Sequence, residues 1–361
     1  MKAWILRNYG DLRLEEVPIP KVEPGWALVK VKVVQAAVVD RGLIHKMPHL
    51  HQAGIEKRLS AGKPVQLGHE YCGEVIEIGA GVTTLKPGNR VCSPAYALCG
   101  TCEMCRTGRE AQCRNRMTIG VEIPGAFAEY VCLPENGLVR VPDGPTDNEV
   151  AALQPLSSCV ADVESAELKM RDTVVVLGQG SMGLGCLQIA KVGGAGLLIA
   201  VDVRLESLEL SRLFGADKII NSAETDPVSE VQKLTGGKGP DVVFETAGGR
   251  KADGLSGFQT PQQAVRMVRR GGKVIQAANL EGNLEIDSVL LRSKRVRYIF
   301  PDSAEVRSLK YAAFLVATKR VQVGPQITHV LHGLDKLPEA MDITGHKAKY
   351  RASNPAQVVV A

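Results

Sequence analysis

Three features are missing from the sequence, and each absence argues against a class of function. No apolar run approaches the roughly 20 residues that a membrane-spanning helix needs, so we expect no membrane partner. The N-terminus MKAWILRNYG lacks the apolar core and small-residue cleavage site of a secretory signal, and we therefore expect a cytoplasmic protein. The net charge of +5 comes without a dense Lys/Arg tract, which argues against nucleic-acid binding.

The 361 residues are too many for one ordinary hydrophobic core. The expected secondary structure changes in character near residue 150. Before this point, short Val/Ile-rich runs broken by Gly and Pro predict a compact, mostly β domain, with strands at 27–34, 73–78, 90–92 and 128–133. Beyond it, a helix is expected over 149–168. Parallel strands are expected at 173–177, 197–201, 218–220, 241–245 and 272–276, with helices ending at 191 and covering 207–214 and 307–319. This alternation predicts an α/β fold with a doubly wound parallel sheet.

A glycine pattern follows the first of these parallel strands and opens a helix. It consists of Gly178, Gly180 and Gly183, with Ser181 and Met182 between the last two. In this context the pattern predicts a dinucleotide site: Gly178 makes a tight turn, Gly180 lets the backbone approach the pyrophosphate, and Gly183 lets the helix pack close to the strand. The N–H groups at the start of the helix would face the phosphates.

The next strand ends at Asp202. A carboxylate at this place bonds the ribose hydroxyls of NAD and repels a 2′-phosphate. Arg204, two residues on, would favour NADP instead. We predict NAD(H) as the cofactor.

The cysteines are odd in number, nine, and four of them crowd together: Cys99, Cys102, Cys105 and Cys113. In a cytosolic chain this spacing indicates metal binding rather than disulfides. Four sulfur ligands can close a tetrahedron around Zn²⁺ and leave no position open for substrate, so the predicted role is structural. A redox pair and an iron–sulfur cluster are the alternatives. The remaining cysteines are expected to be small buried hydrophobes.

Four stretches, in their order along the chain, resemble the medium-chain dehydrogenase/reductase superfamily in its zinc-containing alcohol, polyol and threonine dehydrogenase branch. They are GHEYCG at 68–73 with the following PGNRV, the four-cysteine segment, GAFAEYV at 125–131, and the glycine site with Asp202. The resemblance spans essentially the whole chain. It implies an NAD(H)-dependent oxidoreductase with one structural zinc per chain.

The resemblance also implies a domain organisation. A GroES-like catalytic β domain would cover 1–153, with the zinc lobe at 92–115; a Rossmann domain would cover 154–294, and 295–361 would return to the catalytic domain. The active site would lie in the cleft between the two domains. We expect a homodimer or homotetramer that acts on a small-molecule substrate.

The sequence departs from the family pattern at the catalytic zinc. The family's ion usually takes a cysteine, the histidine of Gly-His-Glu and an acid or second cysteine, and the adjacent glutamate can act as an alternate ligand. Ala37 stands in place of the first cysteine, Val39 in place of the hydroxyl that relays a proton, and Gln154 in place of the later acid. Some sugar dehydrogenases of the family also have glutamine at the last position.

His69, Glu70 and Asp40 keep their family positions, and with Gln154 they form the predicted catalytic set. Asp40 is expected to hold His69 by its far nitrogen. Two alternatives remain open. Either His69, Glu70, Gln154 and water hold Zn²⁺ weakly or bind a harder ion, or no metal binds and His69 acts on the substrate directly. We favour the second. Candidate replacement ligands are His45, His49, His51 and Cys159.

Three functions are compatible with these residues: hydride transfer between NAD(H) and an alcohol–carbonyl pair, metal-free reduction of a conjugated C=C bond, and cofactor binding without turnover. We favour the first because His69, Glu70 and Asp40 are retained together. The basic, histidine-rich segment 41–63 is longer than in the family's shorter members. It is expected either to border the substrate site or to form a solvated loop.

Overall fold

The computed structural model describes residues 1–47, 49, 51–249, 257–280, 282–302, 304 and 306–360, and the chain divides into two compact units. Unit 1 consists of Met1–Ser157, Ala304–Lys319 and Ile327–Ala361, and unit 2 consists of Ser158–Ser303 and Arg320–Gln326. The N-terminal and C-terminal parts of the sequence therefore fold together. None of the helices within the described ranges has the length and apolar character required to cross a membrane.

Unit 1 is built on a seven-stranded sheet in the order β16-β17-β3-β4-β5-β9, with β8 also paired to β3. The strands are β3 (Trp26–Gln35), β4 (Tyr71–Ile78), β5 (Arg90–Cys92), β8 (Tyr130–Pro134), β9 (Val139–Arg140), β16 (Val330–His332) and β17 (Gln357–Val359). The mostly β character predicted for the first part of the chain is confirmed. The C-terminal strand β17 lies antiparallel to β3, with Gln357 opposite Gln35.

Shorter elements surround this sheet. Two small hairpins pair β1 (Lys2–Asn8) with β2 (Asp11–Glu16) and β6 (Tyr96–Ala97) with β7 (Met117–Thr118). The helices are α1 (Val38–Ile44), α2 (Gln52–Ser60), α3 (Glu103–Arg106), α4 (Asp147–Ala151), α11 (Val306–Ala317), α12 (Leu337–Gly345) and α13 (Lys347–Tyr350). The core forms where the apolar face of the sheet meets α1, α2 and α12, through side chains such as Val31, Leu43, Ile55 and Met341.

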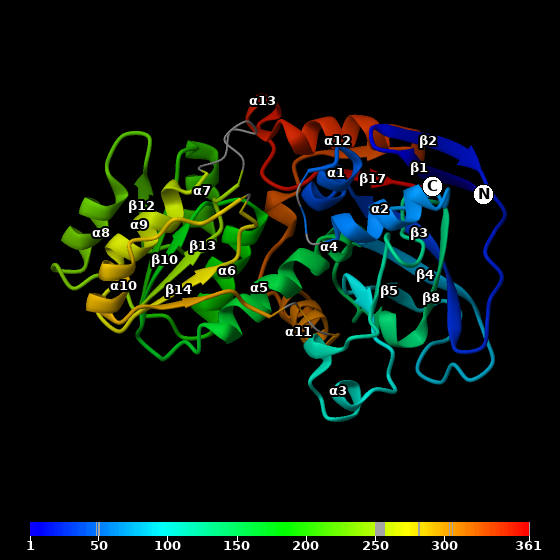
Figure 1. Ribbon diagram of the computed structural model, residues 1–361, viewed down its shortest axis with the longest axis horizontal. Coiled ribbons are helices and arrows are strands. Elements are labelled where there is room, and N and C mark those ends of the chain that lie inside the picture. The colour runs from blue at the N-terminus through cyan, green and yellow to red at the C-terminus, as the bar shows by residue number, and fades with distance from the viewer. Residues whose placement is uncertain are drawn as a thin grey trace. The chain divides into compact units, whose positions relative to one another are not determined.

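Unit 2 contains a six-stranded sheet in the order β12-β11-β10-β13-β14-β15, and every neighbouring pair is parallel. The strands are β10 (Thr173–Leu177), β11 (Leu197–Asp202), β12 (Lys218–Asn221), β13 (Val242–Glu245), β14 (Lys273–Gln276) and β15 (Arg297–Ile299). Between them run α6 (Ser181–Val192), α7 (Leu205–Leu213), α8 (Pro227–Leu234), α9 (Gln259–Met267) and α10 (Ser288–Lys294) (Figure 1). The prediction of a doubly wound parallel sheet is confirmed, and the strand order reverses direction between β10 and β13.

The helix predicted over 149–168 is wrong in its extent. The structure begins a short helix, α4, at Asp147, where Thr146 and Glu149 form a capping box. This helix ends at Ala151, and a second helix, α5, covers Leu153–Ser165. The break falls four residues before Pro155, whose ring clashes with the carbonyl four positions earlier and which has no N–H to donate. Pro155 is therefore tolerated in the first turn of α5.

The described residues of the segment 41–63, which leave out positions 48 and 50, are largely helical rather than a loop. Its first residues complete α1, and Gln52–Ser60 form α2, in which Ile55 is fully buried against the core of unit 1. Burial of this apolar side chain anchors the segment to the rest of the unit. The solvated-loop alternative is therefore wrong for α2.

Candidate functional site

The glycine pattern of unit 2 forms the turn between β10 and α6. Gly178 has a φ of +88°, which favours glycine, and a Cβ at Gly183 would lie 1.8 Å from the carbonyl oxygen of Gly178. Gly180 precedes the first residue of α6, and a Cβ there would meet no atom within 4 Å. The turn therefore needs glycine at two positions for its own geometry, whereas at Gly180 the space is open to a ligand.

Asp202 lies at the end of β11 beside this turn. Its Oδ2 accepts a hydrogen bond from the backbone N–H of Gln179 at 2.6 Å, and its Oδ1 accepts one from the backbone N–H of Arg204 at 2.8 Å. The Arg204 Nε lies 3.7 Å from the same carboxylate. The Asp202 carboxylate is thus fixed next to the glycine turn, with Arg204 beside it.

Ser181 and Met182 are the first two residues of α6. The backbone carbonyl of Met182 accepts a hydrogen bond from the thiol of Cys159 at 3.2 Å, and Cys159 is fully buried in unit 2. This thiol therefore supports the start of α6, which gives it a structural role there.

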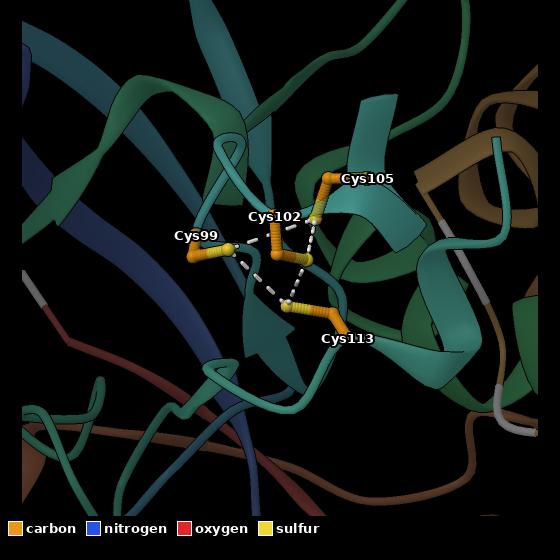
Figure 2. Close-up of side chains that lie close together, drawn as sticks. All are labelled: Cys99, Cys102, Cys105 and Cys113. Atoms are coloured by element: carbon orange, nitrogen blue, oxygen red, sulfur yellow. Dashed lines mark hydrogen bonds between the residues drawn. The ribbon is translucent and has the colours of Figure 1, made fainter. Parts of the chain in front are cut away.

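The four clustered cysteines bring their sulfur atoms together in unit 1 (Figure 2). The Sγ atoms all lie within 4.8 Å of one another, with separations of 3.5 Å between Cys102 and Cys105 and 3.6 Å between Cys113 and Cys99. Sulfur atoms at tetrahedral positions 2.3 Å from a zinc ion would be separated by roughly this distance. The donor set and its geometry fit a structural Zn²⁺.

The local chain folds so that these four sulfur atoms point inward. Gly100 and Gly108 adopt φ values of +70° and +73°, which allow the tight turns on either side of α3. Hydrogen bonds from the backbone N–H groups of Cys102 and Thr101 lower the pKa of Cys99 to about 6, whereas burial and the neighbouring thiols raise the pKa of Cys105 to about 12. Four thiols this close cannot all ionise without a cation, which is what bound Zn²⁺ supplies.

His69, Asp40 and Glu70 come together in unit 1, next to the start of β4. Asp40 lies on α1, and His69 and Glu70 immediately precede β4. The Nδ1 atom of His69 is 3.3 Å from Asp40 Oδ1, and its Nε2 atom is 3.9 Å from Glu70 Oε1. Both carboxyl groups are buried, and the side chain of His69 keeps an exposed fraction of 11%. The structure thus places Asp40 at the far nitrogen of His69.

The electrostatic environment perturbs both titratable groups of this cluster. Burial alone would lower the pKa of His69, but the charge and hydrogen bond of Asp40 outweigh it and raise this pKa to about 9. Burial raises the pKa of Glu70 to about 7, against the opposing effect of His69. A histidine and a glutamate with such pKa values can exchange protons near neutral to mildly alkaline pH.

The altered family positions also lie in unit 1. Ala37 is buried immediately before α1, Val39 lies on α1 and packs against the core, and Gln154 is buried in the first turn of α5. None of the three supplies a thiolate or a carboxylate. Within the described ranges, only the four cysteines bring three or more ligand atoms of His, Cys, Asp or Glu close enough to hold one ion.

His49 and His51 lie near enough to His69 to interact with it electrostatically, but within the described ranges they do not bring three ligand atoms close enough together to form a second metal site. The rings of His49 and His51 have centroids 5.0 Å apart, and His45 is exposed. Burial is the main reason that the pKa of His49 falls and that the pKa of His51 falls to about 3. These two rings are therefore neutral at physiological pH.

A network of buried amides adjoins Glu70, and none of its residues was among the predicted site residues. Gln35 Nε2 donates to Glu70 Oε2 at 2.5 Å. Gln35 Oε1 in turn accepts from Asn354 Nδ2 at 2.5 Å and from Gln357 Nε2 at 3.0 Å. A glutamine in an otherwise apolar stretch, Val33-Val34-Gln35-Ala36-Ala37, was the one visible hint, because a buried amide needs partners.

Comparison with known proteins agrees with this architecture. Residues 23–143 match the family "Alcohol dehydrogenase GroES-like domain", and residues 181–309 match the family "Zinc-binding dehydrogenase". The chain is 32% identical over 344 residues to an L-threonine 3-dehydrogenase of Symbiobacterium thermophilum, covering 92% of this chain and 91% of that protein. It is 31% identical over 275 residues to a sorbitol dehydrogenase of Bacillus subtilis, covering 76% and 74%.

Solved structures show the same similarity. A putative zinc-binding dehydrogenase from Sinorhizobium meliloti, bound to NADP, superposes with a TM-score of 0.83 at 29% identity and covers 99% of this chain and 98% of that one. Alcohol dehydrogenase TADH from Thermus sp. ATN1 has a TM-score of 0.84 at 27% identity, with both chains covered completely at 100%. The chain therefore belongs to the zinc-type medium-chain dehydrogenase/reductase family and is a nicotinamide-dependent dehydrogenase of that class.

Proposed function

We propose that this dehydrogenase transfers a hydride between NAD(H) and the carbon of an alcohol–carbonyl pair, with His69 rather than a second zinc ion acting on the substrate oxygen. The observation that carries the proposal is the pair formed by His69 and the buried Asp40, in a chain where Ala37 and Val39 replace the zinc thiolate and the relay hydroxyl. Bound NAD⁺ supplies the hydride acceptor. In alcohol oxidation, the hydroxyl proton passes to His69 Nε2 as the hydride leaves the carbinol carbon.

The geometry around His69 suits this role. Asp40 engages Nδ1, so the Nε2 atom is the one that remains for substrate. Glu70 Oε1 is 3.9 Å from Nε2, which is longer than a hydrogen bond. In the direction of carbonyl reduction, the protonated ring would donate to the developing alkoxide and stabilise it.

The donor set argues for a single zinc rather than two. The four-cysteine lobe offers four soft ligands close together, whereas in the His69 cluster Asp40 is taken up by His69 Nδ1 and only Glu70 lies near Nε2, at 3.9 Å. Zinc in proteins takes at least three ligands from the chain at catalytic sites. We therefore assign one structural Zn²⁺ per chain to Cys99, Cys102, Cys105 and Cys113.

The pH dependence of turnover follows from the raised pKa of His69. Alcohol oxidation needs the neutral ring as a base, so its rate should rise with pH and level off above about 9, while carbonyl reduction needs the protonated ring and should fall above the same value. Replacing Asp40 by Asn removes the charge that raises this pKa and should move both inflections to lower pH. Profiles of kcat/KM in both directions measure this shift. An unchanged inflection in the Asp40→Asn variant would show that a different group controls the profile.

The cofactor preference should follow Asp202. We expect NADH to bind about tenfold or more tightly than NADPH, because the fixed carboxylate repels a 2′-phosphate. Fluorescence titration of the two cofactors measures the ratio. Asp202→Ala should lower the preference for NADH over NADPH. The matched variant Arg204→Ala should increase this preference, since Arg204 is the nearby cation that would attract a 2′-phosphate. Equal binding of the two cofactors by the unaltered protein would refute this assignment.

The proposed reaction class is tested by a substrate panel with NAD(H). It should contain simple alcohols, sorbitol and other polyols, L-threonine, the corresponding carbonyl compounds and conjugated enones. We expect turnover on at least one alcohol–carbonyl pair. Turnover on enones alone would move the reaction to C=C reduction, and tight NADH binding with no turnover on the whole panel would contradict the proposed activity.

A further inference from the structure

Gln35 is a fully buried amide that touches the proposed catalytic cluster without belonging to it. It ends β3, and the antiparallel pairing of β3 with β17 places it directly opposite Gln357, which is also fully buried. Its Nε2 donates to Glu70 Oε2 at 2.5 Å. Asn354, just ahead of β17, completes the group by donating to Gln35 Oε1.

The orientation of the Gln35 amide is fixed by the network behind it. Gln357 Nε2 donates to the backbone carbonyl of Asn148 at 2.9 Å, and Gln357 Oε1 accepts from the Asn148 side chain at 2.7 Å. A carbonyl can only accept, so the amide of Gln357 must present its nitrogen. That nitrogen and the Asn354 nitrogen both donate to Gln35 Oε1. Gln35 must therefore turn its own N–H group towards Glu70.

This donated hydrogen bond holds one oxygen of Glu70 away from His69. With Oε2 bound by Gln35, the other oxygen stays 3.9 Å from His69 Nε2. A buried carboxylate and a buried imidazolium attract each other strongly at this range. Without the hydrogen bond from Gln35, the Glu70 carboxylate would move into hydrogen-bonding distance of His69 Nε2. It would then take the place of the substrate oxygen at that nitrogen.

We propose that Gln35 is a positioning residue that keeps the Glu70 carboxylate off His69 and so leaves His69 Nε2 open to the substrate oxygen. The proposal rests on the proposed function of His69. Residues near the C-terminus also support the site in this proposal, because Gln357 on β17 and Asn354 just before it orient the Gln35 amide.

The test replaces Gln35 by Met, which has a similar length and no N–H donor. We expect kcat on the best substrate of the panel to fall by about 10-fold to 100-fold, as for other small misplacements of catalytic groups, while the Kd for NADH changes less than about twofold. A crystal structure of the variant should show the His69 Nε2–Glu70 Oε1 separation shortened from 3.9 Å to about 3 Å. Gln188→Met, which removes a buried amide from unit 2, is the matched control and should leave kcat within about twofold.

A double-mutant cycle separates positioning from a general loss of stability. If Gln35 acts by restraining Glu70, Gln35→Met should have little further effect on kcat in a Glu70→Ala background, where no carboxylate remains to restrain. The proposal would be overturned if the fold-losses in kcat of the two single variants multiplied in the double variant. It would also be overturned if the His69–Glu70 separation in Gln35→Met were unchanged. If Gln35→Met does not fold, Gln35→Leu, which is smaller and also has no N–H donor, should show the same loss of turnover.

Turnover of the His69→Ala and Gln35→Met variants tests the catalytic role of His69 and the positioning role of Gln35 separately. Loss of turnover in His69→Ala with normal turnover in Gln35→Met would overturn the role of Gln35 alone. Normal turnover in His69→Ala would instead overturn the catalytic role of His69.

Discussion

Replacing His69 by Ala is expected to lower kcat by about 10²-fold to 10⁴-fold, the usual contribution of a positioned acid–base group. The Kd for NADH should change less than about twofold, because the glycine turn and Asp202 belong to unit 2 whereas His69 belongs to unit 1. Steady-state kinetics and fluorescence titration on the same preparation measure both quantities. The expected result is therefore a much lower kcat with an almost unchanged Kd for NADH.

The control for this variant is His346→Ala. His346 also belongs to unit 1 and also lies next to a carboxylate, that of Asp342 at 2.8 Å, but its side chain is 52% exposed. This substitution should leave kcat unchanged. A His69→Ala variant that keeps turnover close to that of the unaltered protein would remove the basis of the proposed mechanism.

The Cys102→Ser variant is expected to have the second large effect, on stability rather than chemistry. Structural zinc sites contribute a free energy of binding on the order of 10 kcal/mol in small modules, and one lost thiolate opens the tetrahedron formed with Cys99, Cys105 and Cys113. We expect the zinc content to fall and Tm to drop by about 10 °C or more. Thermal unfolding and metal analysis of the purified variant measure both.

Cys132→Ser provides the matched comparison. Cys132 is buried in β8 of the same unit, and its thiol lies near the backbone carbonyl of Lys21 rather than in the cluster. Its zinc content should equal that of the unaltered protein, and its Tm should change far less. A Cys102→Ser protein that is zinc-free and yet as stable as the unaltered protein would contradict the structural role.

The features that the sequence predicts well are those whose residues are close together along the chain. Gly178, Gly180 and Gly183 follow a strand that was predicted with the bounds it has in the structure, 173–177. Their spacing reflects constraints of one local turn, such as the approach of Gly183 to the Gly178 carbonyl. The four cysteines lie within one short segment, so their convergence also depends on local folding.

The amide network could not be predicted in the same way. Gln35 and Gln357 are 322 positions apart and meet only because the C-terminal strand pairs with β3. Neither a periodicity nor a motif marks Asn354 or Gln357, and each alone is an ordinary polar residue near a strand. The network depends on tertiary pairing, which single-sequence patterns do not specify.

The predicted helix over 149–168 was wrong in its extent for a different, local reason. Pro155 has no N–H to donate to the carbonyl of Ala151. The structure therefore divides the segment into α4 and α5. In this case the local rule, a proline that cannot continue the hydrogen bonding of a preceding helix, was available in the sequence.

The central claim, hydride transfer with one structural zinc and no catalytic zinc, is tested most directly by measuring zinc content and turnover on the same sample before and after mild chelation. The account predicts one zinc per chain, retained in the four-cysteine lobe, and a turnover that neither the chelator nor added zinc changes. Two zinc ions per chain, with loss of the second abolishing turnover and added zinc restoring it, would contradict the account and assign His69 and Glu70 to a metal.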